Sequence, residues 1–310
     1  MKQLQILTFS DKPLADSNLL VKSCRDHNLP LEIITPNQEW KVNAFKIKLL
    51  FDYISKESDD TLLLIVDAFD VYVNGKEEEI LDKFRAFKAD IVFSAEANYY
   101  FRNPKLRGAY LKNYPESPTP YQFLNSGTFI GKCGALKKLL KDIIKENKLD
   151  PDNINSFIEV RSDQYLYSKH FVDQSLSSDK KYTLTLDYKH QLFEVTGGRM
   201  RTINLPHFSS FHAFNAYKVE RFLVKLFKLH KYQDLLTDLN YDQKSHLFHN
   251  RVTKTNPPVI HIPGSWKFFD RIINQLINGK RAFSPLRLVA GFLSFLAYMV
   301  SILIPIRLNM

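Results

Sequence analysis

The hydrophobic and polar positions along the first hundred residues alternate between two patterns. Short apolar runs, typical of buried strands, are separated by longer segments whose apolar residues recur every three or four positions, as on one face of a helix. We predict strands at residues 3–9, 31–35, 62–66 and 90–95, and helices at residues 14–27, 45–54 and 77–87. This order favours a parallel sheet with helices on both of its faces.

Beyond residue 97 the pattern becomes less regular. Residues 98–120 are rich in tyrosine and proline, and we expect an aromatic loop that either stacks on sugars or bases or simply packs on the surface. Further strands are expected after Gly127 and at residues 183–186 and 258–260, and further helices at residues 133–145 and 162–171. The chain is thus predicted to be an α/β protein.

Cysteine content and missing motifs limit the compartment and the class of enzyme. Cys24 and Cys133 are the only cysteines, which indicates neither a disulfide framework nor a zinc site and favours a reducing compartment. Residues 1–11 become polar too early for a signal peptide. No G-x-G-x-x-G or P-loop sequence occurs, which argues against dinucleotide-binding enzymes and P-loop kinases.

Positive charge is concentrated in the last third of the sequence. Residues 201–310 hold 15 Lys and Arg against 5 Asp and Glu, which accounts for the whole net charge of +10. Residues 214–240 carry bases at positions 218, 221, 225 and 228 beside an apolar stripe, a spacing typical of a basic amphipathic helix. Such a helix either lies on an anionic membrane surface or is an ordinary solvated helix.

An uncharged hydrophobic segment, residues 288–306, follows Lys280, Arg281 and Arg287. Its length is close to the roughly 20 residues of a transmembrane helix, and a re-entrant, interfacial or buried terminal helix is the alternative. We therefore divide the chain into a body at residues 1–283 and a helical, membrane-associating tail at residues 284–310. The basic flank favours a body at the cytoplasmic face of a membrane, either anchored by the tail or peripheral.

Two carboxylates, Asp67 and Asp70, follow the most apolar of the predicted strands. An open α/β sheet places its ligand site at the carboxyl ends of its strands, and carboxylate oxygens suit Mg²⁺ or Mn²⁺. Because side chains alternate along a strand, the two residues can share a metal only if residues 67–70 turn. Otherwise one aspartate caps the helix at residues 77–87 and the other is solvated.

A histidine ends the strand predicted at residues 258–260. His261 is followed by Gly264 and Lys267. A neutral imidazole is a suitable third ligand for Mn²⁺, and a lysine ammonium group can neutralise a diphosphate. A lone histidine is more often structural, but this one shares the chain with a strand-end aspartate pair.

Polar residues elsewhere are further candidates for the site. Asn125 either hydrogen-bonds a hydroxyl-rich ligand or forms a turn, and Gly127 permits a close backbone approach or a positive φ. Asp163 and Gln164 open a predicted helix, for which Ser162 as N-cap is a sufficient structural explanation. The same two residues form a polar pair at a helix N-terminus, where active sites often lie.

Together these motifs resemble those of retaining glycosyltransferases of the GT-A fold, a Rossmann-like open mixed sheet flanked by helices. Residues 66–71, 124–127 and 163–164 are similar to segments in the glycosyltransferase domain of the procollagen lysyl hydroxylases. The H-x-x-G-x-x-K element at residues 261–267 is similar to that of the glycogenin-like, family 8 enzymes. The resemblance extends over roughly residues 3–268 and excludes the tail.

The resemblance implies a metal and nucleotide site. Asp67, Asp70 and His261 would bind Mn²⁺ or Mg²⁺, and Asp67 would also reach the nucleotide. The remaining donor contacts would come from Gly264 and Lys267 at the diphosphate and from Lys46, or its neighbour Lys48, at the nucleotide. The motif departs from the more usual D-x-D of this fold, because two residues separate Asp67 from Asp70.

The resemblance also implies a sugar site. Asn125, Asp163 and Gln164 would border the donor sugar, and Asp163 would be the group nearest its anomeric carbon. The lysyl hydroxylase relatives carry an acidic run before the glutamine, whereas only Asp163 stands there in this chain.

We therefore expect a metal-dependent retaining glycosyltransferase that transfers a hexose from a UDP-sugar to a glycan or lipid-linked acceptor at a membrane surface. One alternative is a metal-dependent nucleotidyltransferase, although the usual Gly-rich nucleotide loop is absent. The other is a non-catalytic basic module that binds membrane or nucleic acid. The combination of Asp67, Asp70, His261 and Lys267 favours the enzyme, and nucleic acid is not an expected partner.

Overall fold

The computed structural model describes residues 4–37, 39–101, 103–196, 226, 238–264, 269–279, 289, 292–293 and 296. Lys267, nearly all of the basic region 214–240 and most of the tail 284–310 lie outside this range, so the predictions about them stay predictions. Within the described part of the chain, no helix is long and apolar enough to cross a membrane.

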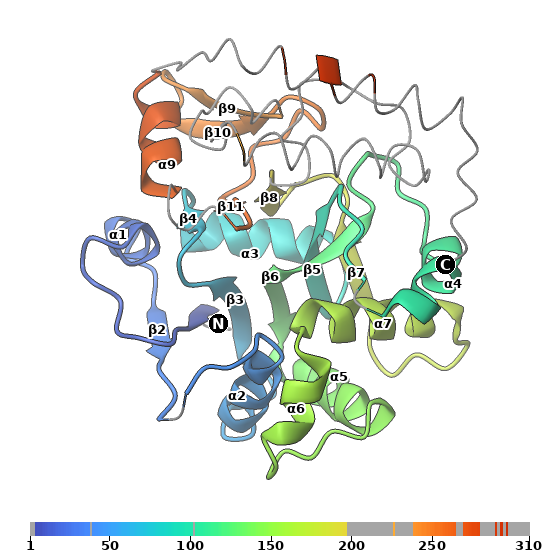
Figure 1. Ribbon diagram of the computed structural model, residues 1–310. Coiled ribbons are helices and arrows are strands. Elements are labelled where there is room, and N and C mark those ends of the chain that lie inside the picture. The colour runs from blue at the N-terminus through green and yellow to red at the C-terminus, as the bar shows by residue number, and fades with distance from the viewer. Residues whose placement is uncertain are drawn as a thin grey trace.

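A mixed sheet forms the centre of the molecule, with strand order β2-β1-β3-β6-β5-β7 (Figure 1). Its strands are β1 (Leu4–Phe9), β2 (Leu31–Ile34), β3 (Leu62–Asp67), β5 (Ile91–Glu96), β6 (Phe123–Lys132) and β7 (Leu184–Asp187). The strands β1, β2 and β3 are mutually parallel, and β7 is parallel to β5. The strand β6 lies between β3 and β5 and runs antiparallel to both.

Helices cover both faces of this sheet. The helices α2 (Phe45–Ile54), α5 (Cys133–Glu146) and α7 (Asp163–Leu176) pack on one face. The helices α1 (Leu19–Asp26) and α3 (Glu77–Ala86) pack on the other. Two further helices, α4 (Pro104–Lys112) and α6 (Asn155–Val160), lie in the connections. The prediction of an α/β sheet flanked by helices on both faces is thus confirmed.

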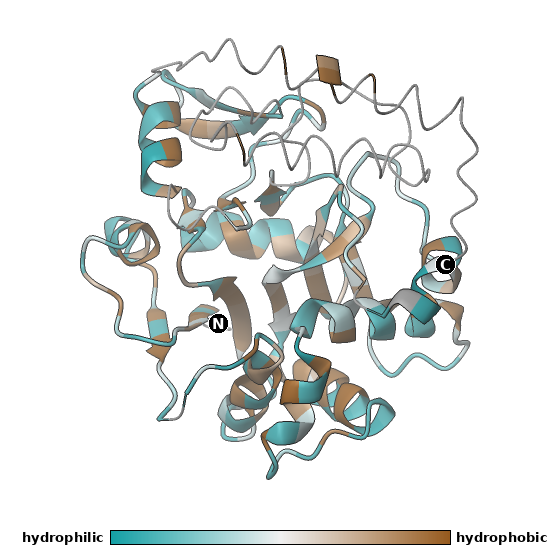
Figure 2. Cartoon of the chain, in the orientation of Figure 1, coloured by the Kyte–Doolittle hydropathy of each residue, from teal (hydrophilic) through white to brown (hydrophobic). Residues whose placement is uncertain are grey.

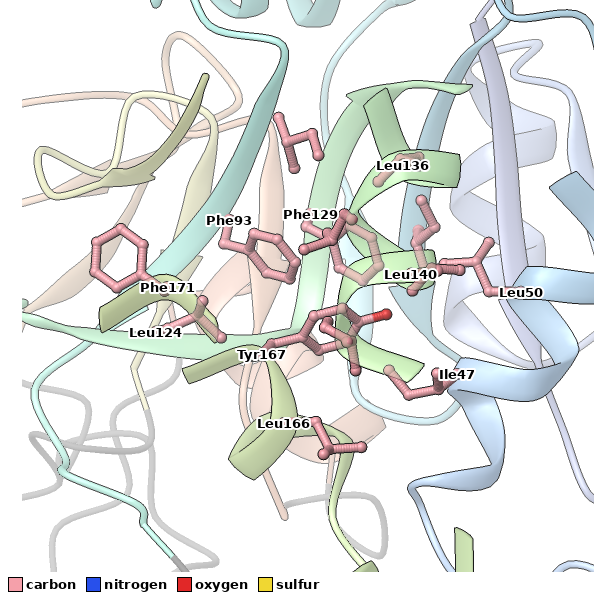
Figure 3. Close-up of a cluster of buried hydrophobic side chains, with 14 of the residues drawn as sticks. Ile47, Leu50, Phe93, Leu124, Phe129, Leu136, Leu140, Leu166, Tyr167 and Phe171 are labelled. Atoms are coloured by element: carbon pink, nitrogen blue, oxygen red, sulfur yellow. The ribbon is translucent and has the colours of Figure 1, made fainter. Parts of the chain in front are cut away.

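The apolar sequence of β3 follows from its burial on two sides. Leu63 and Ile65 belong to the core beneath α2, α5 and α7, whereas Leu64 and Val66 belong to the core beneath α1 and α3. Figure 2 shows β3 as a continuous hydrophobic strand, and Figure 3 shows part of the larger core, where Phe93 stacks on Phe129. Full burial of each such side chain stabilises the fold by roughly 1.5–3 kcal/mol.

A second, three-stranded sheet lies at the carboxyl end of β3. Its order is β4-β11-β8, formed by β4 (Val71–Val73), β11 (Val259–His261) and β8 (Phe193–Val195). The strand β11 is antiparallel to β4 and parallel to β8. A hairpin of β9 (Leu239–Asp242) and β10 (Leu247–Asn250) and the helix α9 (Phe269–Ile277) share a third core with β11.

The structure differs from the sequence predictions at several boundaries. The first helix begins at Leu19 and not at residue 14, because the Asn18 side chain caps it by accepting the Leu20 and Val21 N–H groups. The strand β6 begins at Phe123, so Asn125 lies within a strand and not in a turn. The sheet is not wholly parallel, since β6 follows its antiparallel neighbour β5 without a crossover.

The tyrosine- and proline-rich segment at residues 98–120 is not wholly a loop. It contains α4, which begins where the Asn103 side chain accepts the Lys105 and Leu106 N–H groups and where Pro104 occupies the first turn. Proline is favoured there because its missing N–H would be unpaired in any case. The periodicity of α4 is weak, which is why the sequence pattern did not reveal it.

Candidate metal centre and active site

The chain turns sharply between Asp67 and Asp70. Asp67 is the last residue of β3, and Val71 already begins β4 of the second sheet. Neither carboxylate caps α3, whose N-cap is Lys76 without a side-chain hydrogen bond. The turn between two sheets therefore brings the two carboxylates, which an extended strand would direct to opposite faces, toward one point.

His261 meets this pair from the neighbouring strand. It ends β11 and lies beside Val71 in the antiparallel pairing of β11 with β4. Its Nε2 atom is 3.6 Å from Asp67 Oδ2 and 3.6 Å from Asp70 Oδ1. One ligand atom from each of the three residues lies within 4.8 Å of the others.

The surroundings of His261 fit a divalent cation. The side chain is buried, and neither Nδ1 nor Nε2 has a hydrogen-bond partner among the described residues. A buried polar atom without a partner destabilises a fold by roughly 1–3 kcal/mol, so such a group usually has a ligand. One imidazole nitrogen and two carboxylates are a donor set that Mn²⁺ accepts and that Mg²⁺ also tolerates.

Charge on the two aspartates also acts on this imidazole. Burial alone would lower the pKa of His261, but the carboxylates of Asp70 and Asp67 outweigh it and hold that pKa above its ordinary value. The site therefore attracts positive charge.

Gly127 allows the main sheet to approach this cluster. A β-carbon at position 127 would lie 2.1 Å from Cε1 of His261 and 2.8 Å from Oδ2 of Asp67. The sequence left two reasons for a glycine here, and the structure shows the close approach rather than a positive φ. The strand β6 thus forms one wall of the candidate metal centre.

Gly264 contacts the same centre through its backbone. Its N–H donates to Oδ2 of Asp70 at 2.9 Å, and its φ is +74°, in the left-handed region that favours glycine. The N–H of Ile262 donates to the carbonyl of Asp70 at 3.0 Å. These bonds fix the loop after β11 to Asp70.

Lys46 joins the metal cluster to Asp163. Its Nζ lies 2.5 Å from Asp67 Oδ1 and 3.4 Å from Asp163 Oδ2. Burial would lower the pKa of Lys46, but the two carboxylates outweigh it and the pKa lies above its ordinary value. Burial also tends to raise the pKa of Asp67, yet the charges of Lys46 and His261 hold it below its ordinary value.

The pKa of Asp163, unlike that of Asp67, lies above its ordinary value. Burial raises this pKa more than the charge of Lys46 lowers it. Asp163 opens α7, and Ser162 caps that helix by accepting the Tyr165 N–H. The Ser162 cap therefore accounts for the start of the helix, and the Asp163 carboxylate contacts Lys46.

Glu96 is a polar residue of this region that sequence reasoning missed. Its Oε1 accepts hydrogen bonds from Asn125 Nδ2 at 2.9 Å and from Gln164 Nε2 at 2.8 Å. It is buried, and burial raises its pKa. The signal was present, because Glu96 is the first carboxylate after an apolar strand, as Asp67 is after β3.

The structure thus brings together Asp67, Asp70, His261, Gly264, Lys46 and Asp163 through direct contacts. Asn125 and Gln164 form a second group around Glu96, joined to the first where the Asn125 side chain accepts the N–H of Gly127 at 2.9 Å. Lys48 does not join either group, since it pairs with Asp52 on the surface of α2.

The chain is similar to known proteins over about two thirds of its length. The family model of the PLOD GT domain matches residues 1–224. Procollagen-lysine,2-oxoglutarate 5-dioxygenase 1 of Gallus gallus is 28% identical over 214 residues, which are 66% of this chain and 27% of that protein. The procollagen-lysine,2-oxoglutarate 5-dioxygenase of Drosophila melanogaster is 27% identical over 213 residues, again 66% of this chain and 27% of that protein. The chain therefore spans only 27% of the length of these relatives.

A solved glycosyltransferase involved in the glycosylation of the major capsid of PBCV-1 aligns with 63% of this chain and 86% of its own. The TM-score is 0.34 and the sequence identity 13%, a similarity too low to bear on the fold. The family match carries more weight than this structural similarity, because it covers well over half of the chain. Its range includes Asp67, Asp70, Asn125 and Asp163. The chain belongs to the family of PLOD GT domains, which are glycosyltransferase domains.

Proposed function

We propose that the chain transfers a hexose, with retention, from a UDP-sugar to a glycan or lipid-linked acceptor in a reaction that requires Mn²⁺ or Mg²⁺. The observation that carries the metal requirement is the buried imidazole of His261, which faces two carboxylates and has no hydrogen-bond partner among the described residues. The family supports glycosyl transfer, whereas the donor, the metal and the acceptor are our inference.

The metal would be held by Asp67, Asp70 and His261. When bound, it supplies a Lewis acid that stabilises negative charge on a diphosphate leaving group. Gly264 holds Asp70 in place through its N–H, and Lys46 pairs with Oδ1 of Asp67, whereas His261 faces Oδ2. We assign the backbone at Gly264 and the side chain of Lys267 to the diphosphate, where the lysine ammonium group stabilises developing charge.

The donor sugar is assigned to the space bordered by Asp163, Asn125 and Gln164. Glu96 holds the amides of Asn125 and Gln164 at fixed positions, so both side chains are preorganised beside the proposed sugar site. Asp163, oriented by Lys46, is our candidate for the group nearest the anomeric carbon. No strong protein nucleophile is required if the acceptor attacks the same face that the diphosphate leaves.

The tail and the basic region lead us to propose that this reaction takes place at the cytoplasmic face of a membrane. The hydrophobic residues 288–306 would anchor the body or lie on the membrane, with the basic residues of the last third facing anionic lipids.

A donor screen tests the proposed function. Full-length protein is incubated with each UDP-sugar, with Mn²⁺ or EDTA, and released UDP is measured with lipid-linked acceptors present. We expect one UDP-sugar to release UDP only with metal, and Asp70→Asn and His261→Ala to abolish both turnover and Mn²⁺-dependent UDP binding. Asp52→Asn, on the surface of α2, is the matched control. Unchanged activity in both site variants, or release of pyrophosphate instead of UDP, would refute the proposal.

A further inference from the structure

His190 lies outside the active site and yet contacts both sheets that form it. It is fully buried, and its backbone has a φ of 49°, a conformation that costs a residue with a β-carbon about 1 kcal/mol or more. Asp187 holds this turn, because its carboxylate accepts the N–H groups of Gln191, Leu192 and Phe193 at 2.7–2.9 Å. The imidazole is therefore fixed in one place.

One ring nitrogen of His190 is bonded to the main sheet. Its Nε2 lies 2.9 Å from the carbonyl oxygen of Ala95 at the end of β5. A carbonyl oxygen only accepts hydrogen bonds, so Nε2 carries a hydrogen. The next residue on β5 is Glu96, which holds the amides of Asn125 and Gln164.

The other ring nitrogen faces the second sheet. His190 Nδ1 is 3.1 Å from Oε2 of Glu194, a fully buried residue of β8. Glu194 pairs with Ile260 of β11, and the next pair along the two strands is Val195 with His261. The contact between His190 and Glu194 thus joins β5 to the strands that carry the metal ligand.

Both side-chain amide hydrogens of Asn250 are donated to groups other than His190. Its Oδ1 accepts the N–H groups of Val252 and Thr253 at 2.8 and 2.9 Å, which fixes the orientation of the amide. Its Nδ2 then donates to Glu194 Oε2 at 2.7 Å and to the Tyr121 hydroxyl at 3.0 Å. With both amide hydrogens engaged, Asn250 has none left for Nδ1 of His190, although that atom is 3.2 Å away.

The contact between Nδ1 and Oε2 therefore needs a proton of its own. Without that proton, a ring lone pair and a carboxylate lone pair would face each other at 3.1 Å in a buried site. Further acidic groups lie nearby. They are Asp187 at the end of β7, Glu96 at the end of β5, and Asp238, which accepts a hydrogen bond from Tyr121. Tyr121 itself stacks on the His190 ring.

We propose that His190 and Glu194 form a clasp that is closed by this shared proton and that positions the sheet β4-β11-β8, and with it His261, against the end of β5. The part of the proposal that concerns metal binding rests on the proposed function. His190 and Glu194 are positioning residues, because neither contacts Asp67, Asp70 or His261 through a side chain in the described structure.

The sign of the pH dependence follows from the burial and charge around His190. Burial would lower its pKa, but Glu194 and Asp187 outweigh it, so the pKa of the folded state lies above the ordinary value near 6.5. The stabilisation that the clasp contributes is complete below the ordinary pKa of histidine. It is lost as the pH rises through the pKa of His190 in the folded state. Between the two values, opening of the clasp is expected to increase about tenfold per pH unit.

Amide hydrogen exchange on the full-length protein measures this opening. The N–H groups of Thr196, Val259 and Ile262 bond to His261, Leu192 and Asp70 and thus report how firmly the second sheet is held. After correction for intrinsic exchange, we expect their opening to rise with pH in the wild type. In Glu194→Gln no carboxylate remains to share a proton with Nδ1, so we expect this dependence to disappear.

Glu146→Gln is the matched control. Glu146 lies 3.0 Å from Nδ1 of His170, but that pair connects α5 to α7 and is remote from the second sheet. We expect it to keep the wild-type pH dependence at Thr196, Val259 and Ile262. Equal pH dependence in wild type and Glu194→Gln would refute the clasp.

A second measurement uses only the wild-type protein. Nitrogen-15 shifts of the His190 ring in the wild type are expected to show both nitrogens protonated at pH 7, and a neutral ring at that pH would refute the proposal. Neither readout involves a metal or a sugar. If these results hold and no UDP-sugar is turned over, the proposed function fails and the clasp stands. If Mn²⁺ affinity, relative to Glu194→Gln, also falls as the pH rises, the clasp acts on the metal centre.

Discussion

Gly127 and His261 are packed so closely that a β-carbon on residue 127 would stand 2.1 Å from the imidazole Cε1 atom. The two residues lie on different sheets and are separated by more than a hundred positions in the sequence. Their contact sets how far the second sheet can approach the main sheet. It therefore also sets where the imidazole lies relative to Asp67 and Asp70.

Replacing Gly127 by alanine should move His261 away from the carboxylates. The strand β6 is buried in the sheet and cannot yield easily, so the imidazole must shift. We expect Mn²⁺ affinity, measured by calorimetry with UDP present, to fall by about 10–100-fold, as for other changes that displace a metal ligand. Gly108→Ala is the control, because nothing lies within 4 Å of its added β-carbon. Wild-type affinity in Gly127→Ala would contradict the assigned role.

Replacing Lys46 by methionine should leave Asp67 and Asp163 without their shared cation. Loss of one partner from a buried ion pair typically costs about 3–5 kcal/mol of the free energy of unfolding. Lys48→Met is a matched control two residues along the same helix, since Lys48 pairs with the exposed Asp52. We expect the control to cost about 0.3–0.5 kcal/mol. Urea denaturation compares the two, and equal losses would show that Lys46 is an ordinary surface lysine.

Glu96 is expected to act through the amides that it holds. Glu96→Ala removes the common acceptor of Asn125 and Gln164, whereas Glu96→Gln retains an acceptor oxygen. We expect the alanine variant to lose up to about 100-fold in kcat/KM for the UDP-sugar, because misplaced groups no longer fit the reacting sugar. The glutamine variant should recover a large part of this loss. If both variants behave alike, hydrogen-bond acceptance is not the role of Glu96.

Asn18 connects a helix cap to the turn that carries the aspartates. Its Oδ1 caps α1, and its Nδ2 donates to the carbonyl of Ala68 at 3.0 Å. Asn18→Ala should cost about 1 kcal/mol of stability through the lost cap. Asn18→Asp keeps the cap but cannot donate to Ala68.

These two variants separate stability from metal binding. We expect Asn18→Asp to keep the thermal unfolding temperature close to that of the wild type while it weakens Mn²⁺ binding, measured by calorimetry. A variant that binds Mn²⁺ as tightly as the wild type would show that the bond to Ala68 does not hold the turn.

The early part of the fold was predictable because its signals are local. An apolar run that is buried on both faces, as in β3, and the amphipathic period of α2 and α5 depend on a few neighbouring residues. The helix α4 escaped prediction because its periodicity is weak, and the strand β4 escaped because its partner β11 is distant in the sequence. All three residues of β4 pair with β11, and Val71 lies opposite His261.

Most residues of the candidate site could be selected from the sequence, but their contacts could not. Asp67, Asp70 and His261 could be selected from the sequence by residue type and by their position at strand ends. Their distances, the link through Lys46 and the role of Glu96 were not visible there. The family match ends at residue 224, before β11, so it does not by itself include His261 or Gly264.

The sequence alone determined the alternation of strands and helices, the carboxylates at the end of β3 and the resemblance to a glycosyltransferase, because each rests on residues close together in the chain. The tertiary structure decided that β11 lies beside β4, that Gly127 presses against His261 and that two carboxylates share Lys46. These contacts join segments far apart in the sequence, and only the packing of two sheets sets the distances between them.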